Sequence, residues 1–245
     1  LGTYFGGVNY FNPEYEIYTR YKVGDTEKEG LSSPIVGRMT EDKDGNLWIC
    51  TEGGGVNVYN RKNNTYRWYR HEEGRNSISH NNVKAIYYDR TEEIMWIGTH
   101  LGGLNKLDLH TNRFTVYRMK AGDPATLPSD IVRDIVPYGD KLIIATQNGV
   151  CLFNPATGTC EHLFKDTKEG RNIGMVASLY IDKDETLWVS ATGEGVYSYR
   201  FDTGKLTHYA HNPSIPNTLS NNNVNNIMQD SNGNLWIVKP REKTN

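Results

Sequence analysis

An internal repeat runs through the whole chain and constrains its fold more than any other feature. A tryptophan with apolar neighbours recurs at Trp48, Trp96, Trp188 and Trp236, and Leu142-Ile143-Ile144 takes the same place in the remaining copy. Successive copies follow one another at a period of roughly 45–48 residues, which indicates repeated units that bury one continuous core between neighbours.

Each repeat has the same internal order. A glycine pair follows the tryptophan, as in Gly54-Gly55 and Gly102-Gly103, and Gly6-Gly7 precedes the first of these pairs by one period. Around these landmarks lie four short segments of alternating polarity, which Gly, Asn and Asp turns separate. Four strands per unit at a fixed period predict an all-β fold, a β-propeller of four-stranded blades with about five repeats.

The two ends of the chain leave the number of blades open. Residues 7–21 supply the outer two strands of a blade, and residues 224–238 supply an inner two. The two ends can share one blade and close a five-bladed ring without an open edge. Alternatively, the chain is part of a seven-bladed propeller. In both cases we expect residues 1–245 to form a single propeller domain or propeller fragment, with no second domain.

Composition excludes several classes of protein. The net charge of -2 gives no basic footprint for nucleic acid. No apolar run is long enough to span a membrane in this segment. The three cysteines do not have the spacing of metal ligands, and we expect neither a metal nor a cofactor. Cys151 and Cys160 flank one hairpin: they can pair in an oxidising compartment, or Cys160 can be a buried core thiol.

The residues that carry the period also carry a family resemblance. The pattern Asp-x-x-Gly-x-Leu-Trp-Ile-x-Thr-x-x-Gly-Gly-Leu/Val, clearest in residues 42–56 and 89–104, resembles the two-component regulator propeller repeat. The resemblance implies a periplasmic, ligand-sensing part of an inner-membrane hybrid histidine kinase, with oligosaccharide fragments as the cue. It further implies a neighbouring propeller or β-sandwich domain as partner, a homodimer as one arrangement, and a kinase outside this chain.

The segment that leads into each first strand differs between repeats, and this variation is the best sequence pointer to a binding site. In a propeller the first strand lines the central channel, so these residues would ring one mouth of it. Amide side chains supply both donors and acceptors, which suits the hydroxyl groups of a sugar. The candidate ligand-binding residues are Arg38, His80, Asn81, Asn82, Asp130, Arg133, Asn221, Asn222 and Asn223. The alternative is that they cap turns and solvate the channel.

Residues that recur in every repeat are instead expected to be structural. We assign Trp48, Trp96, Trp188 and Trp236 to packing between blades, and Gly54, Gly55, Gly102 and Gly103 to the turns.

Catalysis has little support in the sequence. Of the mouth residues only Asp130 is acidic, with Asp134 nearby, which falls short of the two carboxylates that glycoside hydrolysis needs. We therefore predict a non-catalytic segment. A five-bladed carbohydrate-active hydrolase and a passive protein-interaction scaffold are the alternatives.

Overall fold

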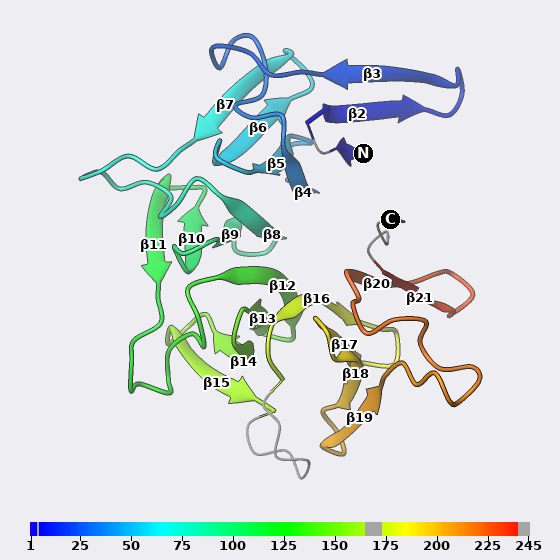
Figure 1. Ribbon diagram of the computed structural model, residues 1–245. Helices are drawn as coiled ribbons and strands as arrows, with labels where there is room; N and C mark the ends of the chain where they lie inside the picture. The colour runs from blue at the N-terminus through cyan, green and yellow to red at the C-terminus, as the bar shows by residue number, and fades with distance from the viewer. Residues whose placement is uncertain (4, 165–172, 240–245) are drawn as a thin grey trace. The chain divides into compact units, whose positions relative to one another are not determined.

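The computed structural model describes residues 1–3, 5–164 and 173–239, and every regular element within them is a β-strand (Figure 1). The described part has no helix that could cross a membrane. The strands form two compact units, Leu1–Arg118 with Asp130–Val132 (unit 1) and Met119–Ser129 with Arg133–Asn245 (unit 2). The all-β prediction is confirmed, whereas the single propeller domain stays a prediction.

Unit 1 contains three antiparallel sheets. The first is β1-β2-β3, and the other two are four-stranded blades in chain order. The strands are β1 (Gly2–Thr3), β2 (Gly7–Asn12) and β3 (Ile17–Tyr21); β4 (Val36–Glu41), β5 (Leu47–Thr51), β6 (Val56–Asn60) and β7 (Thr65–Tyr69); and β8 (Val83–Asp89), β9 (Ile94–Thr99), β10 (Leu104–Asp108) and β11 (Arg113–Tyr117).

Unit 2 repeats this plan with two four-stranded blades and a two-stranded sheet, β20-β21. The strands are β12 (Val132–Tyr138), β13 (Lys141–Thr146), β14 (Gly149–Asn154) and β15 (Thr159–Leu163); β16 (Val176–Ile181), β17 (Thr186–Ala191), β18 (Gly195–Arg200) and β19 (Lys205–Tyr209); and β20 (Asn226–Gln229) and β21 (Leu235–Val238). One period of the sequence thus corresponds to one four-stranded sheet, as predicted.

The first sheet shows which strand pairs with the inner edge of β2. In the structure β1 pairs there, with Gly2 opposite Val8 and Thr3 opposite Gly7.

The core of unit 1 lies between neighbouring blades. Trp48 and Val56 of one blade pack in one buried cluster with Ile86 and Met95 of the next. Trp48 also stacks on Tyr69 at 5.4 Å between ring centroids, so the last strand of its own blade covers the indole. Burial of large apolar side chains between blades is the main force that holds such repeats together.

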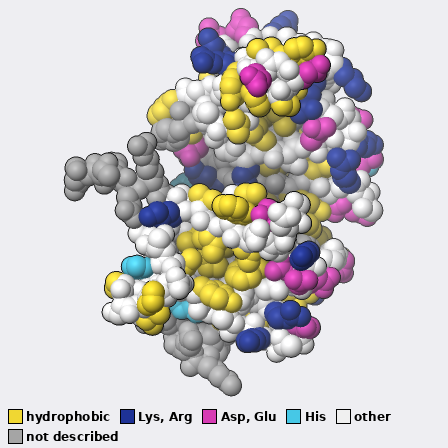
Figure 2. Space-filling view, turned by 90° about the vertical axis from the view of Figure 1, so that its right-hand side faces the viewer, with side chains coloured by type: hydrophobic (Ala, Val, Ile, Leu, Met, Phe, Trp, Pro, Cys, Tyr) yellow, Lys and Arg dark blue, Asp and Glu magenta, His cyan; other side chains and the backbone are white. Residues whose placement is uncertain are grey.

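The terminal sheets leave apolar side chains exposed. In unit 1, Tyr15, Ile17 and Tyr18 of the β2–β3 hairpin are 57% to 64% exposed, and Figure 2 shows hydrophobic side chains on the surface at its upper end. In unit 2, Trp236 is 57% exposed, whereas Trp48 is 3% exposed. Within the described residues the sheet of Trp236 has two strands, and no outer strand covers this indole as the strand of Tyr69 covers Trp48.

A buried carboxylate explains why the tryptophan follows an aspartate turn. Asp42 accepts hydrogen bonds from the backbone N–H groups of Asp44 and Asn46, at 3.0 and 2.9 Å, and from the indole Nε1–H of Trp48 at 2.8 Å. Unit 2 repeats the arrangement twice, with Trp188 donating to Asp182 and Trp236 donating to Asp230. The carboxylate therefore closes the turn and fixes the indole at once.

The second glycine of each pair is required by the backbone. Gly55 has a φ of +76°, and a Cβ atom there would lie 2.1 Å from the carbonyl oxygen of Tyr69. Gly103 has the same φ and would meet the Tyr117 carbonyl oxygen at 2.2 Å. Only glycine fits, because the left-handed turn brings the third strand against the end of the fourth.

A buried asparagine ties each four-stranded blade of unit 1 to the loop that precedes it. Asn57 is fully buried, and its Oδ1 accepts from the Ser32 backbone N–H at 2.7 Å while its Nδ2 donates to the Ser32 hydroxyl at 2.7 Å. Asn105 and Ser79 repeat this clamp. In unit 2, the corresponding residues of the β12–β15 blade are Cys151 and Pro128. Proline has no N–H to donate, so this blade cannot make the same clamp.

Candidate functional site

The loops at one end of the blades carry the residues that the sequence singled out. We call this the mouth end of a blade: the end at which its first strand begins and its second strand turns into its third. At the mouth end of β8–β11, Val83 of β8 lies opposite Thr99 of β9. The parts of unit 1 that meet there are residues 77–82 and 100–103, together with Arg118 and Asp130.

Three predicted residues occupy one repeated position and use their backbone in the same way. The N–H of the last mouth glycine donates to a carbonyl oxygen in the loop that leads into the next first strand. Gly55 donates to Asn81 at 2.8 Å and Gly103 donates to Asp130 at 2.8 Å, and in unit 2 Gly195 donates to Asn222 at 3.0 Å. These carbonyl groups fasten neighbouring blades through the backbone alone, so the side chain at this position can differ from blade to blade.

Several of the predicted asparagines also use their side-chain oxygen inside the loops. Asn81 Oδ1 accepts from the His71 backbone N–H at 2.7 Å, and in unit 2 Asn222 Oδ1 accepts from His211 at 2.6 Å. Asn82 Oδ1 accepts from the Gly53 N–H at 2.5 Å. Part of the asparagine signal at the mouth is therefore turn construction, as the alternative interpretation holds.

Asn221 and Asn223 also build a turn in unit 2, since Asn221 Oδ1 accepts from the Asn223 backbone N–H at 2.7 Å.

Two histidines and an ion pair form the most distinctive group at the mouth end in unit 1. His80 and His100 lie with ring centroids 6.5 Å apart, and an Arg118 guanidinium nitrogen lies 3.7 Å from an Asp130 carboxylate oxygen. The same guanidinium donates to the Leu101 carbonyl oxygen at 3.4 Å. We call His80, His100, Arg118 and Asp130 the histidine cluster. The structure thus brings the predicted His80 and Asp130 together with two residues that sequence reasoning missed.

The surroundings of His80 favour its neutral form. Its Nδ1 accepts from the Asn82 backbone N–H at 3.0 Å, so the ring proton is on Nε2. Burial lowers its pKa, and the nearby charges of His100, His71 and Arg118 lower it further. The imidazole therefore offers a neutral N–H donor, which suits a hydroxyl or carbonyl oxygen of a ligand.

Exposed apolar side chains with left-handed backbone accompany these polar groups. Leu101 has a φ of +72° and is 56% exposed, at the position that Gly53 occupies in the preceding blade. Phe5 holds the same repeat position, with a φ of +64° and 66% exposure. A non-glycine residue with positive φ costs backbone strain, and such strain concentrates at functional sites.

A cavity of about 510 Å³ adjoins Phe5 in unit 1. Arg20, Lys22, Val23 and Pro34 also line it, so its wall combines an aromatic ring with two cationic side chains. A wall of this kind is suited to a polar ligand with an apolar face and acidic groups.

Cationic side chains at the start of the first strands have acidic or amide partners. Lys84 of β8 forms an ion pair with Glu52 in unit 1. In unit 2, Arg133 of β12 donates to Gln147 Oε1 from Nε at 3.2 Å and from a terminal nitrogen at 2.7 Å. Sequence reasoning missed Glu52, His100 and Gln147. The signal was present, because each directly follows the threonine that ends a second strand.

The remaining candidate near the start of a first strand is Arg38, on β4. Arg38 is not equivalent to Lys84. Met39 pairs with Ile49 as Ile86 pairs with Ile97, which places Arg38 one position further along its strand.

Asp134, considered as a second catalytic carboxylate, is 1% exposed in unit 2, and its oxygens accept from the Ile135 and Leu179 N–H groups, both at 2.8 Å. A carboxylate held in this way stabilises two backbone segments.

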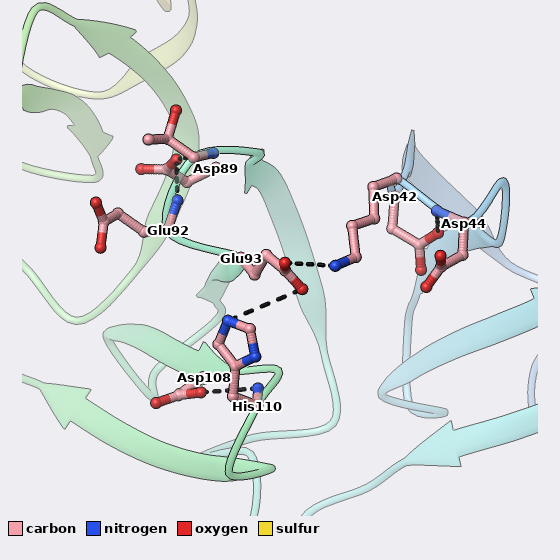
Figure 3. Close-up of polar contacts among 9 residues, drawn as sticks. Asp42, Asp44, Asp89, Glu92, Glu93, Asp108 and His110 are labelled. Atoms are coloured by element: carbon pink, nitrogen blue, oxygen red, sulfur yellow. Dashed lines mark hydrogen bonds and ion pairs between the residues drawn. The ribbon is translucent and has the colours of Figure 1, made fainter.

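The opposite end of the unit 1 blades is rich in carboxylates but consists of turns and ion pairs (Figure 3). Lys43 and Glu93 form an ion pair between the turns of neighbouring blades, and His110 Nε2 lies 3.9 Å from the same glutamate. Asp89 and Asp108 accept backbone N–H bonds within their own turns. Within the described residues, no group of three or more His, Cys, Asp or Glu side chains could hold a metal ion.

The family resemblance is confirmed by comparison with known families. The model described as "Two component regulator propeller" matches residues 30–53 and 218–238. These segments contain the loop before a first strand in each unit, together with two of the aspartate–tryptophan turns. A comparison with curated proteins finds no match.

Solved structures with the same fold include two extracellular domains from B. thetaiotaomicron. One, BT3049, is described as a hybrid two component system: it is 26% identical with a TM-score of 0.74, over 88% of this chain and 28% of that chain. The other, BT4673, is described as a one component system: it is 20% identical with a TM-score of 0.75, over 96% of this chain and 29% of that chain. The chain thus spans less than a third of either structure.

An enzyme shares the fold as well. Virginiamycin B lyase from Staphylococcus aureus is 14% identical with a TM-score of 0.67, over 94% of this chain and 70% of that chain. At this identity the likeness concerns the fold alone, since unrelated activities recur on one architecture.

Proposed function

We propose that this chain, which carries two-component regulator propeller repeats, is a ligand-sensing part of the periplasmic region of a hybrid two-component histidine kinase. The ligand is an oligosaccharide fragment, and the kinase that responds to it lies outside the chain. In this proposal the segment binds and does not catalyse. A neighbouring propeller or sandwich domain of the same sensor, or a second copy, receives the signal.

One observation carries the proposal. The similarity to the extracellular domain of a hybrid two component system extends over 88% of the chain at 26% identity, and it agrees with the family match in two separate segments. The same similarity supports an extracytoplasmic location for the chain. The step from sensor to sugar sensor rests on the chemistry of the mouth end.

The mouth end of unit 1 combines the features that sugar binding requires. The neutral His80 supplies a donor, Arg118 and Asp130 supply charged groups for hydroxyls, and Leu101 presents an apolar surface beside them. A sugar ring has an apolar face and a polar rim, so it needs both kinds of contact in one place. The side chains at these positions differ between blades, whereas the backbone bonds beneath them are the same.

Titration calorimetry of the chain against a panel of neutral and uronate-containing oligosaccharides tests the proposal. We expect at least one fragment to bind, and His80→Ala to weaken that binding about tenfold through the loss of one hydrogen-bond donor and its packing. His110→Ala is the matched control, because His110 is an exposed histidine in the same blade at the opposite end. It should leave the affinity unchanged.

The outcomes distinguish the three candidate functions of the chain: sensor, hydrolase and scaffold. Binding that depends on His80 but not on His110 supports the sensor. Release of new reducing ends from a bound fragment would instead indicate a hydrolase. If no fragment in the panel binds and both variants fold like the parent, the sugar-sensing proposal is refuted and a scaffold role is favoured.

A further inference from the structure

One blade of unit 2 contains two cysteines whose sulfur atoms nearly touch. Cys151 lies on β14 and Cys160 on β15, and their Sγ atoms are 3.2 Å apart. Cys151 is opposite His162 and Cys160 is opposite Phe153 in the strand register. The two cysteines are therefore diagonal neighbours, and side chains two residues apart along a strand lie on the same face of the sheet.

This blade differs from the unit 1 blades at the positions of the serine–asparagine clamp. Pro128 and Cys151 stand where the unit 1 blades have the serine–asparagine clamp, and Cys160 stands where β7 and β11 carry Tyr66 and Phe114. Both thiols thus occur in a blade without the clamp, a condition that the β16–β19 blade shares through Gly174 and Tyr197. The remaining cysteine, Cys50, lies in a buried cluster of unit 1 with apolar neighbours.

We infer that Cys151 and Cys160 form a disulfide in an oxidising compartment and thereby tie the third strand of this blade to its fourth. The Sγ atoms need to approach by about 1 Å to reach the length of an S–S bond. Extracytoplasmic compartments maintain such bonds, and the comparisons with extracellular domains fit that location.

The reaction requires a disulfide oxidant, either a low-molecular-weight disulfide or a thiol–disulfide oxidoreductase. The thiolate of Cys160 attacks one sulfur of the oxidant, breaks its S–S bond and releases one thiol. The thiolate of Cys151 then attacks the Cys160 sulfur in this mixed disulfide and releases the second thiol. The two cysteines lose two protons and two electrons, and the oxidant becomes two thiols.

The order of attack follows from exposure. Cys160 is 9% exposed on an outer strand, whereas Cys151 is fully buried. Burial also raises the pKa of the Cys151 thiol well above its ordinary value, which makes this thiol a poor first nucleophile.

Peptide mass spectrometry of the intact chain tests this inference without a variant. The chain is incubated with oxidised and reduced glutathione, denatured, alkylated and digested with trypsin. No lysine or arginine lies between the two cysteines, so both fall in the peptide 142–165, while Cys50 falls in 44–61. We expect peptide 142–165 to escape alkylation and to be about 2 Da lighter than its reduced form, with Cys50 alkylated in full.

Variants provide the control and a second readout. Cys50→Ala should leave the mass loss in peptide 142–165 unchanged, whereas Cys151→Ala should leave Cys160 alkylated. Oxidation should raise the melting temperature of unit 2 by about 5 °C in the parent and not in Cys151→Ala, because the bond restricts the unfolded chain. Full alkylation of Cys151 and Cys160 after oxidation of the folded chain would overturn the inference.

Discussion

Removal of the Asp42 carboxylate is the sharpest test of how the repeat is held together. Asp42 is 5% exposed and accepts from the Trp48 indole N–H, which is itself in a side chain only 3% exposed. In Asp42→Ala this N–H loses its acceptor in a place that water does not reach. The variant should therefore lose stability mainly because the buried Trp48 indole N–H has no hydrogen-bond acceptor.

The magnitude follows from the hydrogen bonds in the structure. An unsatisfied buried donor costs about 2 kcal/mol, and loss of the two turn bonds from Asp44 and Asn46 adds about 1 kcal/mol, since water can replace the carboxylate there. We expect Asp42→Ala to lower the free energy of unfolding by about 3 kcal/mol. Urea denaturation, followed by circular dichroism and tryptophan fluorescence, measures the loss from the shift in midpoint at constant slope.

The chain contains its own matched control. Asp230 makes the same turn and accepts from the Trp236 indole at 2.9 Å, but Trp236 is 57% exposed. Water can satisfy that indole when the carboxylate is removed, so Asp230→Ala should shift the urea midpoint much less. Equal shifts for the two variants would refute the reasoning, because burial of the indole would then not determine the cost.

Three further predictions follow from the same structure. Gly55→Ala should cost about 3 kcal/mol because its Cβ would meet a β7 carbonyl oxygen, whereas Gly53→Ala, with positive φ but open space, should cost about 1 kcal/mol; urea midpoints of both variants decide. Asn57→Ala should cost about 2 kcal/mol by stranding the Ser32 N–H, and hydrogen exchange of that amide should accelerate while distant amides keep their rates. Burial opposes ionisation of Asp42, but hydrogen bonds outweigh it and lower its pKa. The contribution of the Asp42 carboxylate to stability is therefore complete above the unfolded pKa of 3.8 and is lost as the pH falls through the folded pKa. The difference in free energy of unfolding between the parent and Asp42→Asn should narrow from pH 6 to pH 3. An unchanged difference would contradict the lowered pKa of Asp42.

The sequence determined the blade and its turns. A regular period, with glycine and aspartate at fixed offsets from tryptophan, leaves few ways to bury the apolar positions other than four-stranded sheets packed side by side. The turns are local chemistry. The carboxylate of Asp42 acts within a few residues of itself, and the positive φ of Gly55 is a property of its own turn, so both can be predicted from short motifs.

The tertiary structure alone decided which mouth residues meet and which are already engaged. The sequence places His80 and Asp130 on separate loops, and only the packing of the blade brings them together with His100 and Arg118. The sequence likewise cannot show that Asn81 Oδ1 accepts a hydrogen bond from the backbone N–H of His71, which lies earlier in the same loop. Local spacing specifies hydrogen bonds within one turn, whereas contacts between loops depend on how strands of different length and register end in space.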